Sequence, residues 1–133
     1  MKNLYILILL FLFAGCSVFE NEQSIPLDYT GEWQWIESTG GILGMRIDAD
    51  SVDYTQTLQI LEQNIVKWYL DGELLQEYRA EKSNKKDMDV EYILKPINAG
   101  EHGNMIKSIL GIQNGNLILM DECADCFIYT FKR

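Results

Sequence analysis

The chain has 133 residues, the size of one domain, and its 20 acidic and 11 basic side chains give a formal net charge of −9 at pH 7. Such an acidic chain is a poor partner for nucleic acid, because phosphate neutralisation needs clustered lysine and arginine. It equally disfavours a domain that lies flat on anionic lipid. The simplest role for the charge is to keep the domain soluble.

The first residues have the pattern of an export signal. Residues 4–14 are almost unbroken hydrophobics, preceded by Lys2. The run is too short to span a bilayer, which takes about 20 apolar residues, whereas a basic start, a short apolar core and small residues after it are typical of a signal peptide. The alternative is a buried N-terminal helix, which we disfavour because no polar face interrupts the run.

The segment ends in Phe13-Ala14-Gly15-Cys16, which resembles the bacterial lipobox. In a lipobox, two small residues precede a cysteine that is joined to diacylglycerol and becomes the mature N-terminus. The resemblance implies that residues 1–15 are a cleaved lipoprotein signal and that Cys16 is lipidated, so that an N-terminal lipid anchor holds the protein at a membrane. Stable anchoring needs more than one acyl chain, and a triacylated cysteine meets that need.

The predicted location is the cell envelope, with the protein anchored to the outer membrane and facing either the periplasm or the cell surface. Glu20 and Glu22 resemble the surface-export signals of some lipoproteins from the Bacteroidota, and they fit an ordinary solvated linker equally well. We interpret residues 16–29 as the lipidated cysteine and a polar tether, and residues 30–133 as the folded domain.

The domain opens with a predicted strand over residues 31–38. Period-two alternation places Trp33 and Trp35 on one face, with Glu32 and Gln34 on the other. Further strands are predicted over residues 42–47, 55–61, 65–70, 73–80, 90–94, 105–113, 116–121 and 127–133. We find no helical pattern after the signal.

Two pairs of residues mark hairpins, because a type I′ turn needs positive φ at both central positions. Around Asn114-Gly115, a two-residue turn pairs Ile112 with Leu117 and Leu110 with Leu119, and we expect this apolar face to point inward.

The second hairpin turns at Asp71-Gly72, where the same rule places Trp68 opposite Leu75 and Ile65 opposite Tyr78. Neither face of this hairpin is purely apolar. That mixture indicates a β-bulge or a position at a barrel rim.

The strand rhythm predicts an all-β fold, a single antiparallel up-and-down barrel of eight strands, or about eight to nine. A strand at each end of the domain lets the first and last strands pair, which removes the exposed edges. Such a barrel is wide enough to be filled with side chains or to hold one small ligand.

The opening Gly31-Glu32-Trp33 is similar to the Gly-x-Trp motif of lipocalin-like domains. The wider pattern resembles the small lipocalin-like lipoproteins of Bacteroidota, with a lipobox, then residues 30–35, residues 38–44, and residues 121–125 followed by an aromatic strand. The resemblance implies that Trp33 closes one end of the barrel beneath a basic residue of the last strand, Lys132 or Arg133. It also implies a domain that binds a small hydrophobic molecule or a partner.

The clearest chemical motif is Cys123-x-x-Cys126. A redox site would place its first cysteine at a helix N-terminus, whereas a strand follows here. Structural zinc needs four ligands, and the chain has one histidine, His102. We therefore predict a local disulfide, with two free thiols as the alternative, and no metal or cofactor.

We do not expect an enzyme. His102 lies between glycines in a predicted loop and has no nucleophile with a supporting carboxylate near it in the sequence. The carboxylates form no acid–base motif, and no glycine-rich phosphate loop follows a strand.

Aromatic side chains are the candidates for lining a ligand pocket, since binding sites are mainly apolar with a few polar groups. They are Trp35, Trp68, Tyr69, Tyr78, Tyr92 and Tyr129. The alternative is that these side chains fill the barrel core, which a chain of this length favours.

The predicted function is that of a lipid-anchored envelope lipoprotein with a lipocalin-like domain for a small hydrophobic molecule, acting as a monomer. One alternative is an inhibitor or partner-binding lipoprotein that uses the exposed loops at residues 82–89 and 98–104, with an envelope protein as the partner. The other is a structural envelope component without a ligand.

Overall fold

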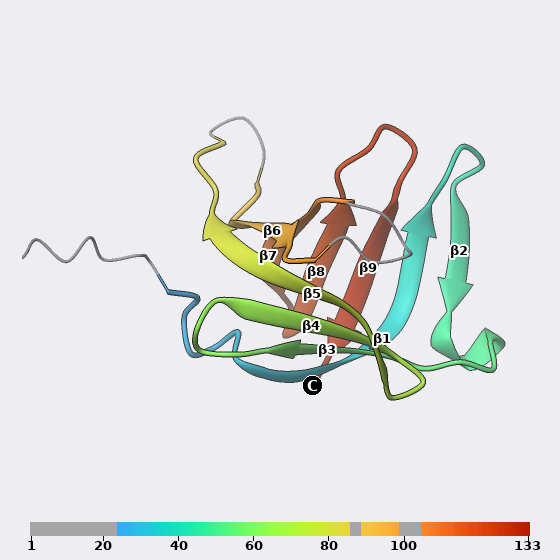
Figure 1. Cartoon of the computed structure of the whole chain (residues 1–133). Coiled ribbons are helices and arrows are strands. Elements are labelled where there is room, and N and C mark those ends of the chain that lie inside the picture. The colour runs from blue at the N-terminus through green and yellow to red at the C-terminus, as the bar shows by residue number, and fades with distance from the viewer. Residues whose placement is uncertain (1–23, 86–88, 99–104) are drawn as a thin grey trace, which may run out of the picture.

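The computed structural model describes residues 24–85, 89–98 and 105–133, which form a closed barrel of antiparallel strands (Figure 1). The strands are β1 (Gly31–Gly40), β2 (Met45–Asp48), β3 (Gln56–Ile60), β4 (Ile65–Leu70), β5 (Glu73–Lys82), β6 (Tyr92–Pro96), β7 (Lys107–Gln113), β8 (Asn116–Asp121) and β9 (Phe127–Lys132), with one 3₁₀ helix, η1 (Ala49–Ser51). Within the described segments no helix has the length and apolar character to cross a membrane. The predicted all-β lipocalin-like barrel of eight to nine strands is confirmed.

Several predictions concern residues outside this description. The signal peptide at residues 1–15, the lipidated Cys16 and His102 lie there, as do parts of the predicted loops at 82–89 and 98–104. The lipid anchor therefore stays a prediction.

The barrel closes through β1 and β9, the first and the last strand. Along this seam Gln34 pairs with Lys132, and Gly40 pairs with Phe127. The other edge of β1 is shared, because residues 31–34 pair with β3 whereas its later residues pair with β2. Eight strands complete the ring, and β2 extends the wall past β3 beside the upper part of β1 (Figure 1).

Both predicted two-residue turns are present. Asp71 and Gly72 have φ values of 50° and 80°, and Asn114 and Gly115 have values of 53° and 81°. These positive angles at both central positions are those that a type I′ turn requires.

Three β-bulges shift the pairing, at Ile36 in β1, Leu75 in β5 and Leu110 in β7. The predicted bulge in the β4–β5 hairpin is thus present. It makes two predicted pairs wrong, because Trp68 lies opposite Gln76 and not Leu75, and Ile65 lies opposite Arg79 and not Tyr78. A bulge adds one residue to one strand, so every pair beyond it moves by one position.

The bulge in β7 changes the β7–β8 hairpin, which turns at Asn114-Gly115, in the same way. Ile112 pairs with Leu117 as predicted, but Leu119 pairs with Ile109, and Leu110 is the extra residue. The predicted Leu110–Leu119 pair is therefore wrong. The bulge brings Ile109, which has no exposed surface, into the core.

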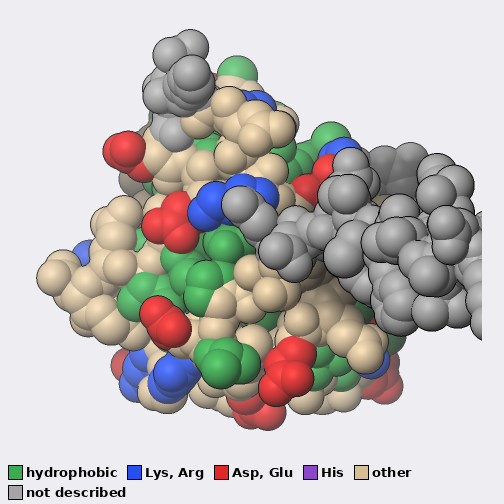
Figure 2. Space-filling view, turned by 90° about the vertical axis from the view of Figure 1, so that its left-hand side faces the viewer, with side chains coloured by type: hydrophobic (Ala, Val, Ile, Leu, Met, Phe, Trp, Pro, Cys, Tyr) green, Lys and Arg blue, Asp and Glu red, His purple; other side chains and the backbone are tan. Residues whose placement is uncertain are grey.

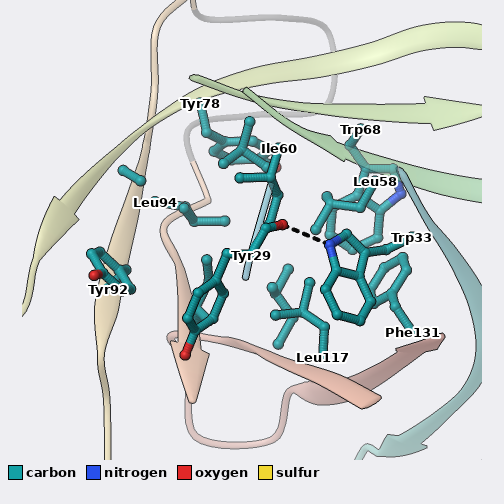
Figure 3. Close-up of a cluster of buried hydrophobic side chains, with 14 of the residues drawn as sticks. Tyr29, Trp33, Leu58, Ile60, Trp68, Tyr78, Tyr92, Leu94, Leu117 and Phe131 are labelled. Carbon is teal, nitrogen blue, oxygen red and sulfur yellow. Dashed lines mark hydrogen bonds between the residues drawn. The ribbon is translucent and has the colours of Figure 1, made fainter. Parts of the chain in front are cut away.

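The core fills the end of the barrel that holds Tyr29, Trp33 and Arg133, which we call the closed end. Large apolar side chains from both sides of the barrel converge there (Figure 3). The fully buried ones include Trp33, Leu58, Ile60, Leu94, Leu117 and Phe131. Little space is left for a ligand at this end.

The folded part of the chain begins earlier than the predicted boundary at residue 30. Ile25 and Tyr29 belong to the buried core. The backbone amide of Ile25 donates to Asn64 Oδ1 at 2.7 Å, and Tyr29 stacks edge-on against Tyr92 at 5.8 Å between ring centroids. Residues 25–29 therefore cap the barrel, because burying these two apolar side chains stabilises them against the domain.

The surface seen from the left-hand side of Figure 1 carries charges of both signs. Acidic and basic side chains lie around and between hydrophobic ones on this face (Figure 2). The basic groups visible there have acidic neighbours, which agrees with the acidic composition of the chain.

Candidate functional site

A cavity of about 270 Å³ lies at the opposite end of the barrel, which we call the open end. Seven of the nine strands contribute to its wall. The lining side chains are Ser38, Ile47, Tyr54, Gln56, Trp68, Leu75, Gln76, Tyr78, Met105, Lys107, Phe127 and Tyr129. The cavity is therefore an aromatic pocket with a few polar groups, which is the usual composition of a small-molecule site.

Three of the six aromatic residues predicted to line a pocket lie in its wall. They are Trp68, Tyr78 and Tyr129. Trp35 lies directly behind the wall, where its ring stacks on Tyr54 with 5.7 Å between centroids. Trp35 also donates from Nε1 to Ser38 Oγ at 2.8 Å.

The other two predicted residues lie elsewhere, so their assignment to the pocket wall does not hold. Tyr69 follows Trp68 in β4 and points to the outside, since successive side chains in a strand face opposite ways. It lines a separate outer hollow of about 230 Å³ and donates to Gln59 Oε1 at 3.3 Å. Tyr92 is buried against Tyr29 at the closed end.

An ion pair is buried in the pocket wall. Lys107 is 7% exposed and Asp121 is 5% exposed, and the Lys107 ammonium bonds to Asp121 Oδ1. The Lys107 nitrogen lies 4.5 Å from the ring centroid of Trp68 and 4.8 Å from that of Tyr129. Tyr129 donates from its hydroxyl to Asp121 Oδ2 at 3.0 Å. The ammonium is thus held by one carboxylate and two aromatic faces.

The two tyrosines next to this pair keep their protons. Burial, reinforced by the negative charge of Asp121, raises the pKa of Tyr78 well above its ordinary value of 10.0. The same two causes, together with the hydrogen bond to Asp121, raise the pKa of Tyr129. Both hydroxyls are therefore hydrogen-bond donors at physiological pH.

The bulge at Leu110 is what brings Lys107 into the pocket. Strict alternation from the Asn114-Gly115 turn would direct Leu110 inward and Lys107 outward. With Leu110 as an extra residue, Lys107 instead lies opposite Asp121 on the inner face. The pair was not predicted from the sequence, because unbroken alternation directs Lys107 outward.

One signal for the bulge is present in the sequence, Gly111 within a predicted strand. Interior strand glycines often mark a bulge or a close backbone approach. Gly111 has a φ of 122°, and a Cβ there would lie 2.9 Å from Oε1 of Glu91. Glycine therefore fits both the backbone angle and the space at this position.

At the closed end, the two residues predicted to close the barrel, Trp33 and Arg133, are in contact. The Arg133 guanidinium lies 4.5 Å from the ring centroid of Trp33. Arg133 also donates to the main-chain carbonyls of Thr30, at 3.0 Å, and Asp28. Trp33 donates from Nε1 to the carbonyl of Tyr29 at 2.8 Å. These contacts join the start and the end of the barrel.

Cys123 and Cys126 form a disulfide contact in the connection between β8 and β9, with their Cα atoms 5.3 Å apart. This separation falls in the usual range for a disulfide. The connection packs closely on the end of β1, where a side chain at Gly40 would collide with the carbonyl of Cys126. The cysteines therefore lie at the rim of the open end and not in the pocket.

Comparisons with models of known protein families, with curated proteins and with solved structures give no match. We therefore infer the function from the geometry of the pocket and from the sequence patterns described above.

Proposed function

We propose that this protein is a lipid-anchored envelope lipoprotein whose barrel binds one small, mainly apolar molecule at its open end. The observation that carries the proposal is the aromatic pocket with the buried Lys107–Asp121 pair in its wall. A buried ion pair is seldom more stabilising than apolar side chains of the same volume. Its presence beside an open cavity is better explained by ligand recognition than by stability.

The size of the pocket limits the ligand. Pockets for drug-sized molecules usually measure about 300 to 1,000 Å³, and this one, at about 270 Å³, lies just below that range. We therefore expect a ligand smaller than a typical drug, which agrees with a chain too short for a large internal cavity.

We propose binding and not catalysis. The lining side chains include no cysteine, histidine, aspartate or glutamate among the described residues. Ser38, the one aliphatic hydroxyl in the wall, accepts a hydrogen bond from Trp35 and has no base beside it in the described part of the chain. A nucleophile needs such a base.

The test is native mass spectrometry of the full-length protein, extracted in detergent from the cells that make it. We expect a small molecule that stays bound and is released on denaturation. Leu75→Trp would fill the pocket from the β5 bulge and should remove that molecule, whereas Leu74→Trp, at an exposed neighbouring position, should retain it. A wild-type protein without a bound molecule, or equal retention in the two variants, would contradict the proposal.

The anchor is tested separately through Cys16. We expect the mature protein to begin at Cys16 with the added mass of acyl chains and to fractionate with membranes. Cys16→Ser should abolish both the added mass and the membrane association, because the lipid contributes about 0.8 kcal/mol per buried methylene. An unmodified wild-type N-terminus would exclude the lipid anchor while leaving the pocket proposal intact.

A further inference from the structure

The acceptor atoms around the pocket are largely used by the protein itself. Trp35 Nε1 donates to Ser38 Oγ at 2.8 Å, and Trp68 Nε1 donates to Gln56 Oε1 at 3.0 Å. The carboxylate of Asp121 accepts from both Lys107 and Tyr129. A ligand therefore finds few free acceptors in this wall.

Several donors, in contrast, have no acceptor among the described residues. These are the hydroxyl hydrogens of Ser38, Tyr54 and Tyr78 and the side-chain amide nitrogen of Gln56. Lys107 has three N–H groups, of which one is used by Asp121. Among the described side chains no buried polar atom is left without a partner, so the hydroxyl and amide groups without an acceptor are open to solvent or to the cavity. Lys107 itself lines the pocket. The pocket is thus rich in donors.

Gln76 is the exception in this wall. Its side-chain nitrogen donates to the carbonyls of Glu77, at 2.9 Å, and Asn98, at 3.0 Å. The oxygen of this amide is therefore directed away from those bonds and can accept. The tyrosine hydroxyls of the wall can also accept, whereas the Lys107 ammonium can only donate. A ligand group placed at Lys107 must therefore be an acceptor.

The charges of the pocket favour a neutral ligand. Among the described residues, Lys107 is the one lining side chain that carries a formal charge, and Asp121 balances it from behind the wall. A carboxylate ligand would add a second negative charge beside that balanced pair, and a buried charge without its own partner is costly. A cationic ligand would meet the Lys107 ammonium, which already occupies the faces of Trp68 and Tyr129.

We infer that the pocket selects a neutral, mainly apolar molecule that carries a carbonyl group, with the carbonyl oxygen accepting from the Lys107 ammonium. Tyr78, which lines the same pocket, supplies the second donor. This inference rests on the proposed function, because it names the class of ligand for that same pocket.

Four probes of nearly equal size separate the ligand classes. They are acetophenone as the neutral carbonyl, ethylbenzene as its apolar counterpart, benzoate as the anion and benzylamine as the cation. Binding to the full-length protein in detergent is measured by equilibrium dialysis against protein-free micelles of the same detergent. We expect acetophenone to bind about 10-fold more tightly than ethylbenzene, because a site built to hydrogen-bond a ligand discriminates against the analogue that lacks the bond. Benzoate and benzylamine should bind more weakly than acetophenone.

Two variants locate the effect. Tyr78→Phe keeps the ring and removes the hydroxyl. It should weaken the binding of acetophenone about five-fold and leave the binding of ethylbenzene unchanged. The double substitution Lys107→Met with Asp121→Leu removes both charges together, so that no buried charge is left unpaired. It should abolish the preference for acetophenone and retain ethylbenzene.

The outcomes distinguish the two proposals. Equal binding of acetophenone and ethylbenzene, or strongest binding of benzoate or benzylamine, would overturn the ligand class while the binding function stands. Failure of all four probes would overturn the ligand class as well, and native mass spectrometry would then decide the binding function independently.

Discussion

Each end of the barrel holds a tryptophan beneath a basic side chain, and the two arrangements differ in what surrounds the cation. At the closed end, the exposed Arg133 lies 4.5 Å from Trp33 and donates to main-chain carbonyls. At the open end, the buried Lys107 lies 4.5 Å from Trp68 and is paired with Asp121. The first contact covers a filled core, whereas the second borders a cavity.

The contact of Arg133 with Trp33 is explained by its structural role, whereas the burial of Lys107 beside Trp68 is not explained by stability. An exposed guanidinium keeps most of its hydration, so its contact with an aromatic ring has little cost. A buried ammonium and a buried carboxylate each lose hydration at a cost of several kcal/mol. We therefore place the proposed function at the open end.

Removing the closed-end tryptophan should have the largest effect. Trp33 is 1% exposed, and Trp33→Ala should lower the free energy of unfolding by about 3 to 5 kcal/mol, because it leaves a cavity in the core at the closed end. Urea unfolding followed by far-UV circular dichroism measures the loss. Trp68→Ala should cost less, since part of that ring already borders the pocket; a larger loss for Trp68→Ala would contradict the contrast between the ends.

Breaking the buried ion pair should come next. Lys107→Met leaves Asp121 buried with Tyr129 as its remaining donor and should cost about 3 kcal/mol in the same unfolding experiment. In the double variant Lys107→Met with Asp121→Leu, the free energy of unfolding should be within about 1 kcal/mol of the wild-type value, because no charge is left unpaired. An unchanged free energy of unfolding in Lys107→Met would mean that the pair is not buried as described.

Alkaline pH should weaken the open end. The pKa values of Tyr78 and Tyr129 are raised by burial and by the charge of Asp121, so the unfolded chain loses these protons first, above pH 10. The folded state then binds more protons than the unfolded state, and stability falls as pH rises. We expect a loss of about 1 kcal/mol per tyrosine for each pH unit above 10. Tyr78→Phe should reduce the loss of unfolding free energy per pH unit. An unchanged loss would argue against the burial of Tyr78.

The disulfide at the rim of the open end should contribute little. Replacing Cys123 and Cys126 by serine should cost about 2 kcal/mol or less, because the loop that the bond closes is very short. Thiol titration of the non-reduced protein gives the direct check. Two titratable thiols would show that the cysteines are not bonded to each other.

The smallest effect is expected at the surface of the closed end. Arg133→Ala removes an exposed cation from Trp33 and two bonds to main-chain carbonyls, and it should cost about 1 kcal/mol. Lys132→Ala is the matched control, since its exposed side chain has no ion pair among the described residues, and it should be close to neutral. Equal effects of the two substitutions would show that the contact with Trp33 contributes nothing.

Most of the fold could be predicted because it depends on local patterns. Alternation identified the faces of β1, and the Asp71-Gly72 and Asn114-Gly115 pairs located both tight turns. The aromatic residues of the pocket were predicted in part, since Trp68, Tyr78 and Tyr129 share the inner face. The start of the domain was missed because Ile25 and Tyr29 lie in a short segment with Pro26 and the exposed Leu27, and this segment forms no strand.

The charged centre of the site could not be predicted in this way. Whether Lys107 faces inward depends on the bulge at Leu110, and both faces of that hairpin are apolar enough to fit either register. Only the packing of Ile109 and Leu119 in the assembled barrel decides between the two registers. Gly111 was the available hint, and it specifies a bulge without specifying which residue is extra.

The seam between β1 and β9 also governs how the chain folds in time. The first strand of the barrel finds its last partner only after β9 has been made, so closure depends on contacts between distant parts of the sequence. Such contacts slow folding, and until they form, the facing edges of β1 and β9 stay unpaired and open to association with other chains. For a chain that is exported as we propose, this delay is an advantage, since it keeps the polypeptide unfolded until the last strand has crossed the membrane.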